Sequence, residues 1–106
     1  MTGPYGLTPQ TVARMRAVFA RHANVDEATL YGSRAIGTFR PGSDIDVTLM
    51  GQKLQLRQLL KIATELDALM LPYKFDLSLF HQLDNSQLID HIRRVGIAIY
   101  MSQARG

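Results

Sequence analysis

The stretch Leu30–Gly51, LYGSRAIGTFRPGSDIDVTLMG, combines a Gly-Ser turn with two aspartates, two positions apart, at the start of an apolar run. Aspartate is a poor strand former, yet Asp44 and Asp46 stand at the beginning of what reads as a buried strand, DIDVTLM. Alternation along a strand puts both carboxylates on one face and the apolar residues between them on the other. We therefore expect an apolar side packed against a helix and an acidic side facing away from it.

Helices and strands are expected to alternate around this stretch. Thr8 and Pro9 suit an N-cap and a first helical position, and the apolar periodicity that follows predicts a helix over residues 9–22. The remaining elements are predicted in the same way: helices at 52–69 and 84–96, strands at 27–33 (ended by Gly32), 44–50 and 74–80, a brief helix or tight loop at 33–42, and an edge strand or apolar tail at 97–101. This order predicts an α/β or α+β fold, in which helices pack on a small mixed sheet.

The helix over 52–69 is predicted to face the core, with Pro72 marking its end. The apolar residues at helical spacing are Leu56, Leu59, Leu60, Ala63, Leu66 and Met70. The strand over 74–80 alternates cleanly, which puts its apolar residues on one face and Lys74, Asp76 and Ser78 on the other.

The chain has 106 residues, of which 46% are hydrophobic and 20% charged, and this predicts one globular domain over residues 1–106. No apolar run approaches the roughly 20 residues that span a bilayer, and the N-terminus lacks the pattern of a signal peptide. Because the chain also contains no cysteine, we expect a cytoplasmic protein without membrane contact. Lys and Arg exceed Asp and Glu by 12 to 9, which suits an anionic ligand such as a nucleotide. The basic residues are scattered without interleaved aromatics, so we expect no direct DNA binding.

Three carboxylates define the candidate catalytic site. Asp76 lies on the polar face of its strand, as Asp44 and Asp46 lie on theirs, so the three converge if the two strands are neighbours. Unpaired carboxylates a few ångströms apart raise one another's pKa, and a hard cation relieves the repulsion. Mg²⁺ takes oxygen ligands and completes its shell with water and phosphate oxygens. Carboxylates that bridge two such ions, about 3.5–4 Å apart, form a clamp for in-line phosphoryl displacement.

The first half of the stretch offers a phosphate-binding turn. Gly32 lets the backbone approach a ligand closely because it has no Cβ, and Ser33 supplies a hydroxyl and an N–H at a helix start. Arg34 and Arg40 are candidates to neutralise phosphate charge. Other phosphate motifs are absent from the sequence: it has no GxxxxGK followed by Ser or Thr, and GSRAIG lacks the middle glycine of a dinucleotide fingerprint.

Gly32-Ser33, ten intervening residues and Asp44-x-Asp46 together resemble the signature of the DNA-polymerase-β-type nucleotidyltransferases. More narrowly, the chain is similar to the minimal nucleotidyltransferase (MNT) family, from Leu30 through the HIRRVGIAIY tail. The resemblance implies a polymerase-β-like fold and ATP as the substrate.

The resemblance also implies a role for each matching residue. Gly32 and Ser33 contact the terminal phosphates of the nucleotide, and Asp44 and Asp46 ligate two Mg²⁺ ions. Asp76 joins one of these metals and helps to deprotonate the attacking hydroxyl. Position 36 holds isoleucine where the family often has a basic residue, which removes one phosphate contact but no metal ligand.

A nucleotide and two metals occupy most of the face of a small sheet, so we expect the acceptor to come on another molecule or at a subunit interface. In the MNT family the partner is typically a helical HEPN protein, and the pair resembles a toxin–antitoxin module. The resemblance therefore implies an antitoxin that transfers AMP from ATP to a tyrosine of a HEPN toxin. Two alternatives stay open: transfer to a small hydroxylated molecule held by a partner subunit, and an antitoxin that acts by binding alone.

Individual residues also have simpler interpretations. SDID is equally a polar strand start with Ser43 or Asp44 as a turn residue, and GSR on its own is common in loops. His22, His81 and His91 show no metal-ligand spacing, so they are predicted to be surface or capping residues.

Overall fold

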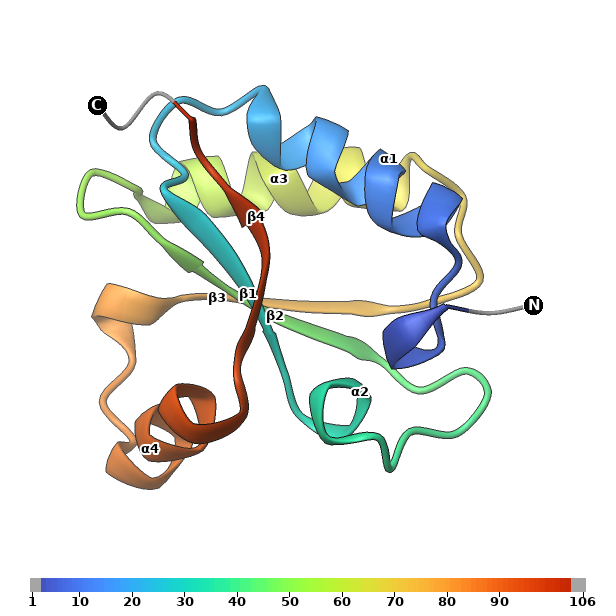
Figure 1. Ribbon diagram of the computed structural model, residues 1–106. Coiled ribbons are helices and arrows are strands. Elements are labelled where there is room, and N and C mark those ends of the chain that lie inside the picture. The colour runs from blue at the N-terminus through green and yellow to red at the C-terminus, as the bar shows by residue number, and fades with distance from the viewer. Residues whose placement is uncertain (1–2, 104–106) are drawn as a thin grey trace.

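The chain folds into a four-stranded sheet with helices on both faces (Figure 1). A computed structural model describes residues 3–103. The strands are β1 (Glu27–Tyr31), β2 (Ile45–Met50), β3 (Phe75–Leu79) and β4 (Ile97–Met101), and their order across the sheet is β3-β2-β1-β4. β1 runs antiparallel to β2 and β4, whereas β2 and β3 are parallel. The mixed sheet and the α+β class predicted from the sequence are confirmed, with β4 as an edge strand.

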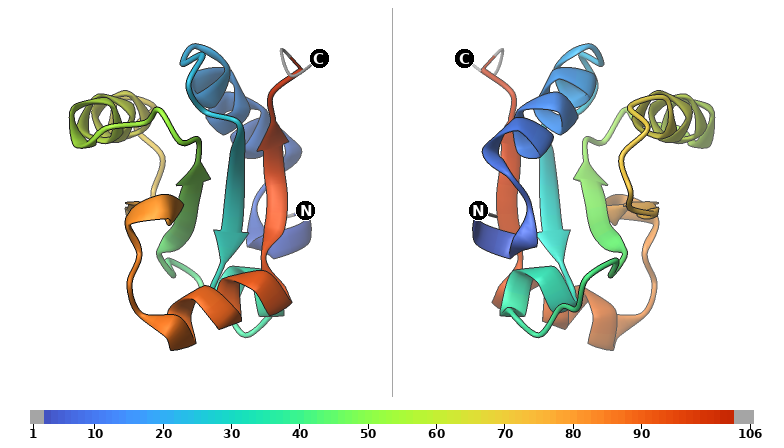
Figure 2. Two further views of the ribbon diagram at one scale, coloured as in Figure 1. Left: turned by 90° about the vertical axis from the view of Figure 1, so that its left-hand side faces the viewer. Right: turned by 90° about the vertical axis from the view of Figure 1, so that its right-hand side faces the viewer.

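Helices cover the two faces of the sheet in pairs. Within the described residues they are α1 (Pro9–Ala20), α2 (Ser33–Ile36), α3 (Leu56–Asp67) and α4 (Ser86–Val95), with 3₁₀ turns η1 (Pro4–Gly6) and η2 (Phe80–Gln82). α1 and α3 lie side by side over one face, and α2 and α4 lie on the other side (Figure 2). Because β2 and β3 are parallel, the chain must cross over the sheet between them, and α3 is the crossover helix.

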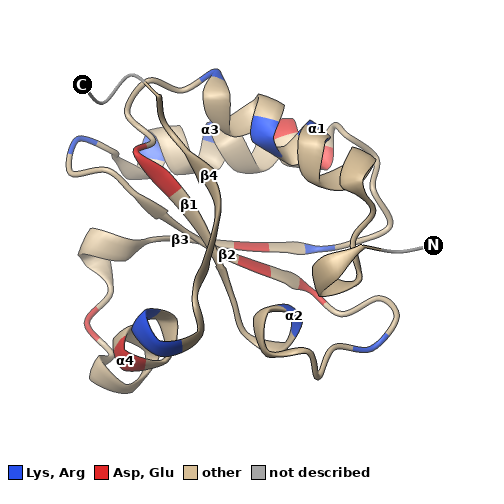
Figure 3. Cartoon of the chain, viewed as in Figure 1, with Lys and Arg blue, Asp and Glu red and all other residues tan. Residues whose placement is uncertain are grey.

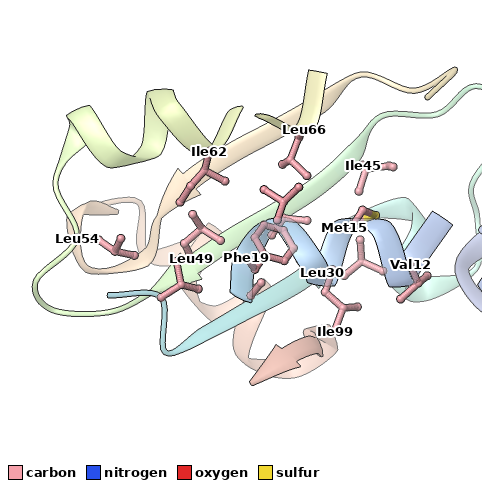
Figure 4. Packing of buried hydrophobic residues seen from close by; sticks show 14 of the residues in the cluster. Val12, Met15, Phe19, Leu30, Ile45, Leu49, Leu54, Ile62, Leu66 and Ile99 are labelled. Atoms are coloured by element: carbon pink, nitrogen blue, oxygen red, sulfur yellow. The ribbon is translucent and has the colours of Figure 1, made fainter. Parts of the chain in front are cut away.

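The apolar faces of the strands form one core with α1 and α3 (Figure 4). Ile45, Val47 and Leu49 are fully buried, so the alternation predicted for β2 is confirmed. Phe19 of α1 and Leu66 of α3 belong to the same cluster. Full burial of such a side chain contributes about 1.5–3 kcal/mol, which makes this layer the main source of stability.

Helix starts follow the cap signals in the sequence. At α1, Thr8 Oγ1 accepts a hydrogen bond from the Thr11 N–H at 3.1 Å. At α4, Asn85 Oδ1 accepts from the N–H groups of Gln87 at 3.0 Å and Leu88 at 3.1 Å. These side chains satisfy N–H groups that have no partner inside the helix, so the first turn forms where the sequence places it.

The predicted inner face of α3 is partly wrong. Leu66 is buried and Leu59 packs against the core, but Leu56 and Leu60 are each 58% exposed. Ile62, which was not predicted to face the core, is fully buried. Ile62 and Leu66 are one helical turn apart on the inner side, so the apolar stripe of this helix is wider than the face that the sheet covers.

The ends of α3 also differ from the prediction. The helix begins at Leu56 rather than at residue 52, because Gln55 and Gln58 form a reciprocal capping box there. Met70, predicted for the inner face, follows the helix and is 85% exposed. No helix in the described part of the chain is long and apolar enough to cross a membrane.

Candidate active site

The Gly-Ser turn joins β1 to α2 and lies against an acidic side chain. Gly32 is the N-cap of α2 and has φ 74° and ψ −154°, a backbone conformation that is essentially restricted to glycine. A Cβ on Gly32 would collide with Oδ2 of Asp46. Glycine is therefore required here both for the turn and to admit the carboxylate. Ser33 follows as the first residue of α2.

Two of the three predicted carboxylates lie opposite each other on neighbouring strands. Asp44 comes just before β2, Asp46 is within β2, and Asp76 is within β3. Asp46 and Asp76 are register partners in the parallel ladder, and the acidic positions of the two strands run side by side in Figure 3. Asp46 is half-buried, whereas Asp44 and Asp76 are exposed. The condition set from the sequence, that the two strands be neighbours, is met.

The surroundings of Asp46 disfavour its ionised form. Burial raises the pKa of the Asp46 carboxyl above its ordinary value of 3.8, and the charges of Asp76 and Asp44 raise it further. His91 and Arg34 act in the opposite direction. The carboxylates on this side of the sheet therefore repel one another, and the repulsion favours the protonated form of Asp46.

These carboxylates suit Mg²⁺ without forming a closed cage. Among residues 3–103, no three Asp, Glu, His or Cys side chains form a group that could hold a metal ion by themselves. Mg²⁺ commonly uses one or two protein carboxylates and fills its shell with water and substrate phosphates, so a pair such as Asp46 and Asp76 fits its chemistry. A cation bound there would also relieve the repulsion that raises the pKa of Asp46.

Arg34 has a different role from the predicted phosphate contact. Its side chain is buried, with only 2% of the residue exposed. Nε and Nη2 donate to the Ser43 carbonyl at 3.1 and 2.8 Å, and Nη1 donates to the Tyr5 carbonyl at 2.8 Å. The guanidinium also lies 4.7 Å from the ring centroid of Tyr73 and 5.3 Å from that of Phe39. Arg34 therefore fixes the backbone at the start of β2, and its guanidinium is committed to the protein.

Arg40 opens the turn that leads into β2. The Ser43 N–H donates to the Arg40 carbonyl at 2.9 Å, with Pro41 and Gly42 between them, a pattern typical of a type II turn. Ser43 Oγ accepts a hydrogen bond from the Arg40 N–H at 2.8 Å. The Arg40 side chain is exposed and, with Tyr73, lines a cavity of about 520 Å³. Arg34 lines the same cavity, but its guanidinium is bonded to backbone carbonyls, whereas the Arg40 side chain has no such bond among the described residues.

His91 was not predicted for the site, but α4 brings it to the Gly-Ser turn. Its Nε2 accepts a hydrogen bond from the Gly32 N–H at 3.1 Å, and its ring stands edge-on to Tyr31 with the centroids 6.2 Å apart. Burial raises the pKa of Tyr31, a hydrogen bond with Ser78 lowers it, and the nearby aspartates raise it. The available signal was that His91 precedes the buried Ile92 in an amphipathic helix, a position turned toward the sheet.

The sequence matches a protein-family model described as polymerase beta, nucleotidyltransferase, over residues 14–105. This span includes the Gly-Ser turn, the three aspartates and His91. Among curated proteins, none matches the chain.

Solved toxin–antitoxin complexes contain chains of the same fold. A chain from a toxin–antitoxin complex with AMP-PNP has a TM-score of 0.69 and 18% identity, over 92% of this chain and 76% of that one. A chain from the MntA–HepT toxin–antitoxin complex has a TM-score of 0.66 and 14% identity, over 89% and 73% of the two chains. A chain from tri-AMPylated Shewanella oneidensis HEPN toxin in complex with MNT antitoxin also has a TM-score of 0.66 and 14% identity, over 89% and 72%. At these identities the likeness shows a shared fold.

Proposed function

We propose, from the premise that the chain belongs to the polymerase beta nucleotidyltransferase family, that it transfers AMP from ATP to a hydroxyl group of a protein partner. The contact between the Gly-Ser turn and the acidic pair is the main support. A Cβ on Gly32 would collide with the Asp46 carboxylate, and Asp76 is the partner of Asp46 across the ladder. A phosphate-binding turn this close to a cation-binding pair suits a substrate whose phosphates carry Mg²⁺.

The proposed roles divide between the turns and the strands. The backbone of Gly32 and Ser33 and the Ser33 hydroxyl bind the terminal phosphates, and Arg40 neutralises phosphate charge from the next turn. When bound, the metal stabilises negative charge that develops on the phosphate oxygens. The carboxylates proposed to hold two Mg²⁺ ions are Asp44, Asp46 and Asp76.

The proposed reaction is an in-line displacement at the α-phosphate of ATP. The acceptor oxygen bonds to the α-phosphorus, the bond from that phosphorus to the oxygen that bridges to the β-phosphate breaks, and pyrophosphate leaves. The hydroxyl proton passes to the exposed carboxylate of Asp76. The protein contributes by positioning the reactants and by neutralising charge. Arg34 contributes indirectly, because it holds the Ser43 carbonyl just ahead of the first aspartate.

The proposed acceptor is a tyrosine of a HEPN-type toxin, which would make this chain an antitoxin. Chains of the same fold come from complexes described as MntA–HepT toxin–antitoxin and as AMPylated HEPN toxin with MNT antitoxin. The exposure of Asp44 and Asp76 is compatible with an acceptor delivered by a macromolecule. Such a partner would also bring its own acceptor hydroxyl to the site, which the small sheet has no further surface to bind.

Transfer of label from ATP labelled at the α-phosphate, with Mg²⁺, to proteins that co-purify with the chain tests this proposal. Asp46→Asn is expected to lower transfer roughly 1000-fold or more, because it removes a metal ligand. Asp67→Asn is the matched control, since Asp67 is an exposed acidic residue at the end of α3. It should transfer at the wild-type rate.

The identity of the labelled product separates the possible acceptors. Label on a partner protein that disappears with Asp46→Asn supports protein adenylylation, and mass spectrometry should find the gain of one AMP on a tyrosine. Label on a small molecule would point to a small-molecule acceptor. A stable complex that takes up no label would contradict transfer and favour an antitoxin that acts by binding alone.

A further inference from the structure

The Gly-Ser turn is tied to a helix from the far end of the chain. The Gly32 N–H donates to His91 Nε2 at 3.1 Å, across 59 positions of sequence. A ring nitrogen accepts a hydrogen bond only when it carries no proton, so this bond requires the tautomer with the proton on Nδ1. The imidazole is half-buried and leans edge-on against Tyr31, the last residue of β1.

This hydrogen bond acts at the most constrained point of the site. The Gly32 peptide adopts a conformation essentially restricted to glycine, and its Cα faces the Asp46 carboxylate with no space between them for a Cβ. The Gly32 carbonyl already accepts from the N–H groups of Ala35 at 3.1 Å and Ile36 at 3.2 Å. The bond to His91 engages the N–H of the same residue, so both backbone polar groups of Gly32 are hydrogen-bonded.

His91 is also well placed on α4 to do this. Ile92 is the buried residue of this helix, and Arg93 and Arg94 that follow it are exposed. His91 therefore extends from a helix anchored by one apolar side chain toward the turn rather than into the core. Gly32 links the two side chains, because its N–H contacts His91 and its Cα faces Asp46.

We propose that His91 is a positioning residue for nucleotide transfer: by accepting the Gly32 N–H, its imidazole holds the Gly32-Ser33 turn in the conformation that receives the phosphates and leaves room for Asp46. This inference rests on the proposed function, because it assigns the phosphates to the turn. His91 does not act as the base, since its unprotonated nitrogen is occupied by the Gly32 N–H.

Two substitutions separate hydrogen bonding from packing. His91→Phe keeps an aromatic ring against Tyr31 but removes the acceptor. His91→Gln loses the ring but keeps an acceptor oxygen at a similar distance from the backbone. If the hydrogen bond is what positions the turn, His91→Phe should raise the KM for ATP roughly fivefold to tenfold, the change expected for the loss of one hydrogen bond. A turn that acts mainly by binding ATP would leave kcat changed less than KM. His91→Gln should restore KM to near the wild-type value.

The experiment combines ATP titration, transfer kinetics and NMR of the ¹⁵N-labelled protein. The wild-type imidazole should show the Nδ1-protonated tautomer, and the Gly32 amide resonance should move in His91→Phe and much less in His91→Gln. A wild-type KM in His91→Phe would overturn the inference, as would an equal loss in both variants or an Nε2-protonated ring. These outcomes overturn the role of His91 alone, because the wild-type protein still binds ATP. A wild-type protein that binds no ATP would overturn the proposed function, and this inference with it.

Discussion

The two faces of the sheet bury different kinds of side chain, and burial has opposite effects on stability. On the face covered by α1 and α3, Val47 and its apolar neighbours are fully buried in one hydrophobic cluster. On the face with α2 and α4, Thr48 is just as buried, but Ser78 Oγ donates a hydrogen bond to its Oγ1 at 2.9 Å. Asp46 on this face is half-buried, and that burial raises the pKa of its carboxyl. One face supplies stability, whereas the other holds a partly buried carboxyl at a cost in stability.

The largest effect is expected from breaking the apolar face. Leu66→Ala should lower the free energy of unfolding by about 3 kcal/mol, because Leu66 is fully buried and its removal leaves a cavity. Leu60→Ala is the matched control on the same helix, and its effect should stay within about 0.5 kcal/mol because Leu60 is 58% exposed. Urea denaturation followed by circular dichroism measures both. Equal losses for the two variants would contradict an α3 that turns Leu66 inward and Leu60 outward.

The same pair of leucines shows why the strands were easier to predict than the helix. Alternation along a strand is strict, so DIDVTLM could only put its carboxylates on one face and its apolar residues on the other. A helix carries a broad apolar stripe, and in α3 the stripe includes Leu56 and Leu60, which the sheet does not reach. The sequence pattern defines such a stripe but does not say which part of it the neighbouring elements cover.

The candidate site divides in a similar way. The Gly-Ser turn, Asp44 and Asp46 are local in sequence, whereas the juxtaposition of Asp46 and Asp76 needed alternation in both strands and one assumption about strand pairing. Arg34 and His91 differ because each depends on partners that only the folded chain brings near. Arg34 is a charged residue that becomes buried by donating to the Ser43 carbonyl, and nothing in its local sequence marks it for the interior. His91 meets Gly32 only through the docking of α4.

Breaking the polar face should have a smaller effect on stability but a larger effect on activity. Gly32→Ala should cost about 2 kcal/mol in the free energy of unfolding, from its backbone conformation and the collision with Asp46. It should also lower transfer at least tenfold, roughly the effect of losing 1.4 kcal/mol of transition-state stabilisation. Gly37→Ala is the control: Gly37 has φ 86°, but its Cβ would meet nothing within 4 Å. It should cost about 1 kcal/mol and leave transfer unchanged. Parallel losses of transfer in both variants would mean that the Gly32–Asp46 contact has no special role.

The smallest expected effect on stability comes from removing the charge of Asp46. Unlike the substitutions above, this one should stabilise the fold. In the folded protein the pKa of this carboxyl lies above 3.8, so between 3.8 and the raised value the native state binds more protons than the unfolded chain. Stability therefore falls as the pH rises through that window, and the full penalty is present at neutral pH. Asp46→Asn removes the penalty, so in EDTA at pH 7 it should raise Tm by at most a few °C, because Asp46 is only half-buried and solvent screens its charge. The difference should shrink as the pH falls toward 3.8, because wild-type Asp46 is then increasingly protonated.

Mg²⁺ should reverse the difference in Tm between Asp46→Asn and the wild-type protein. A cation that binds the folded wild-type protein raises its Tm by mass action, whereas Asp46→Asn has lost a ligand and should gain little. Thermal melts of both proteins with increasing Mg²⁺ should therefore converge and then cross, with calcium-free buffer and the Asp67→Asn variant as controls. A variant that is less stable than the wild type in EDTA would show that the acidic face stabilises the fold by itself. The two faces of the sheet would then differ in composition but not in their contribution to stability.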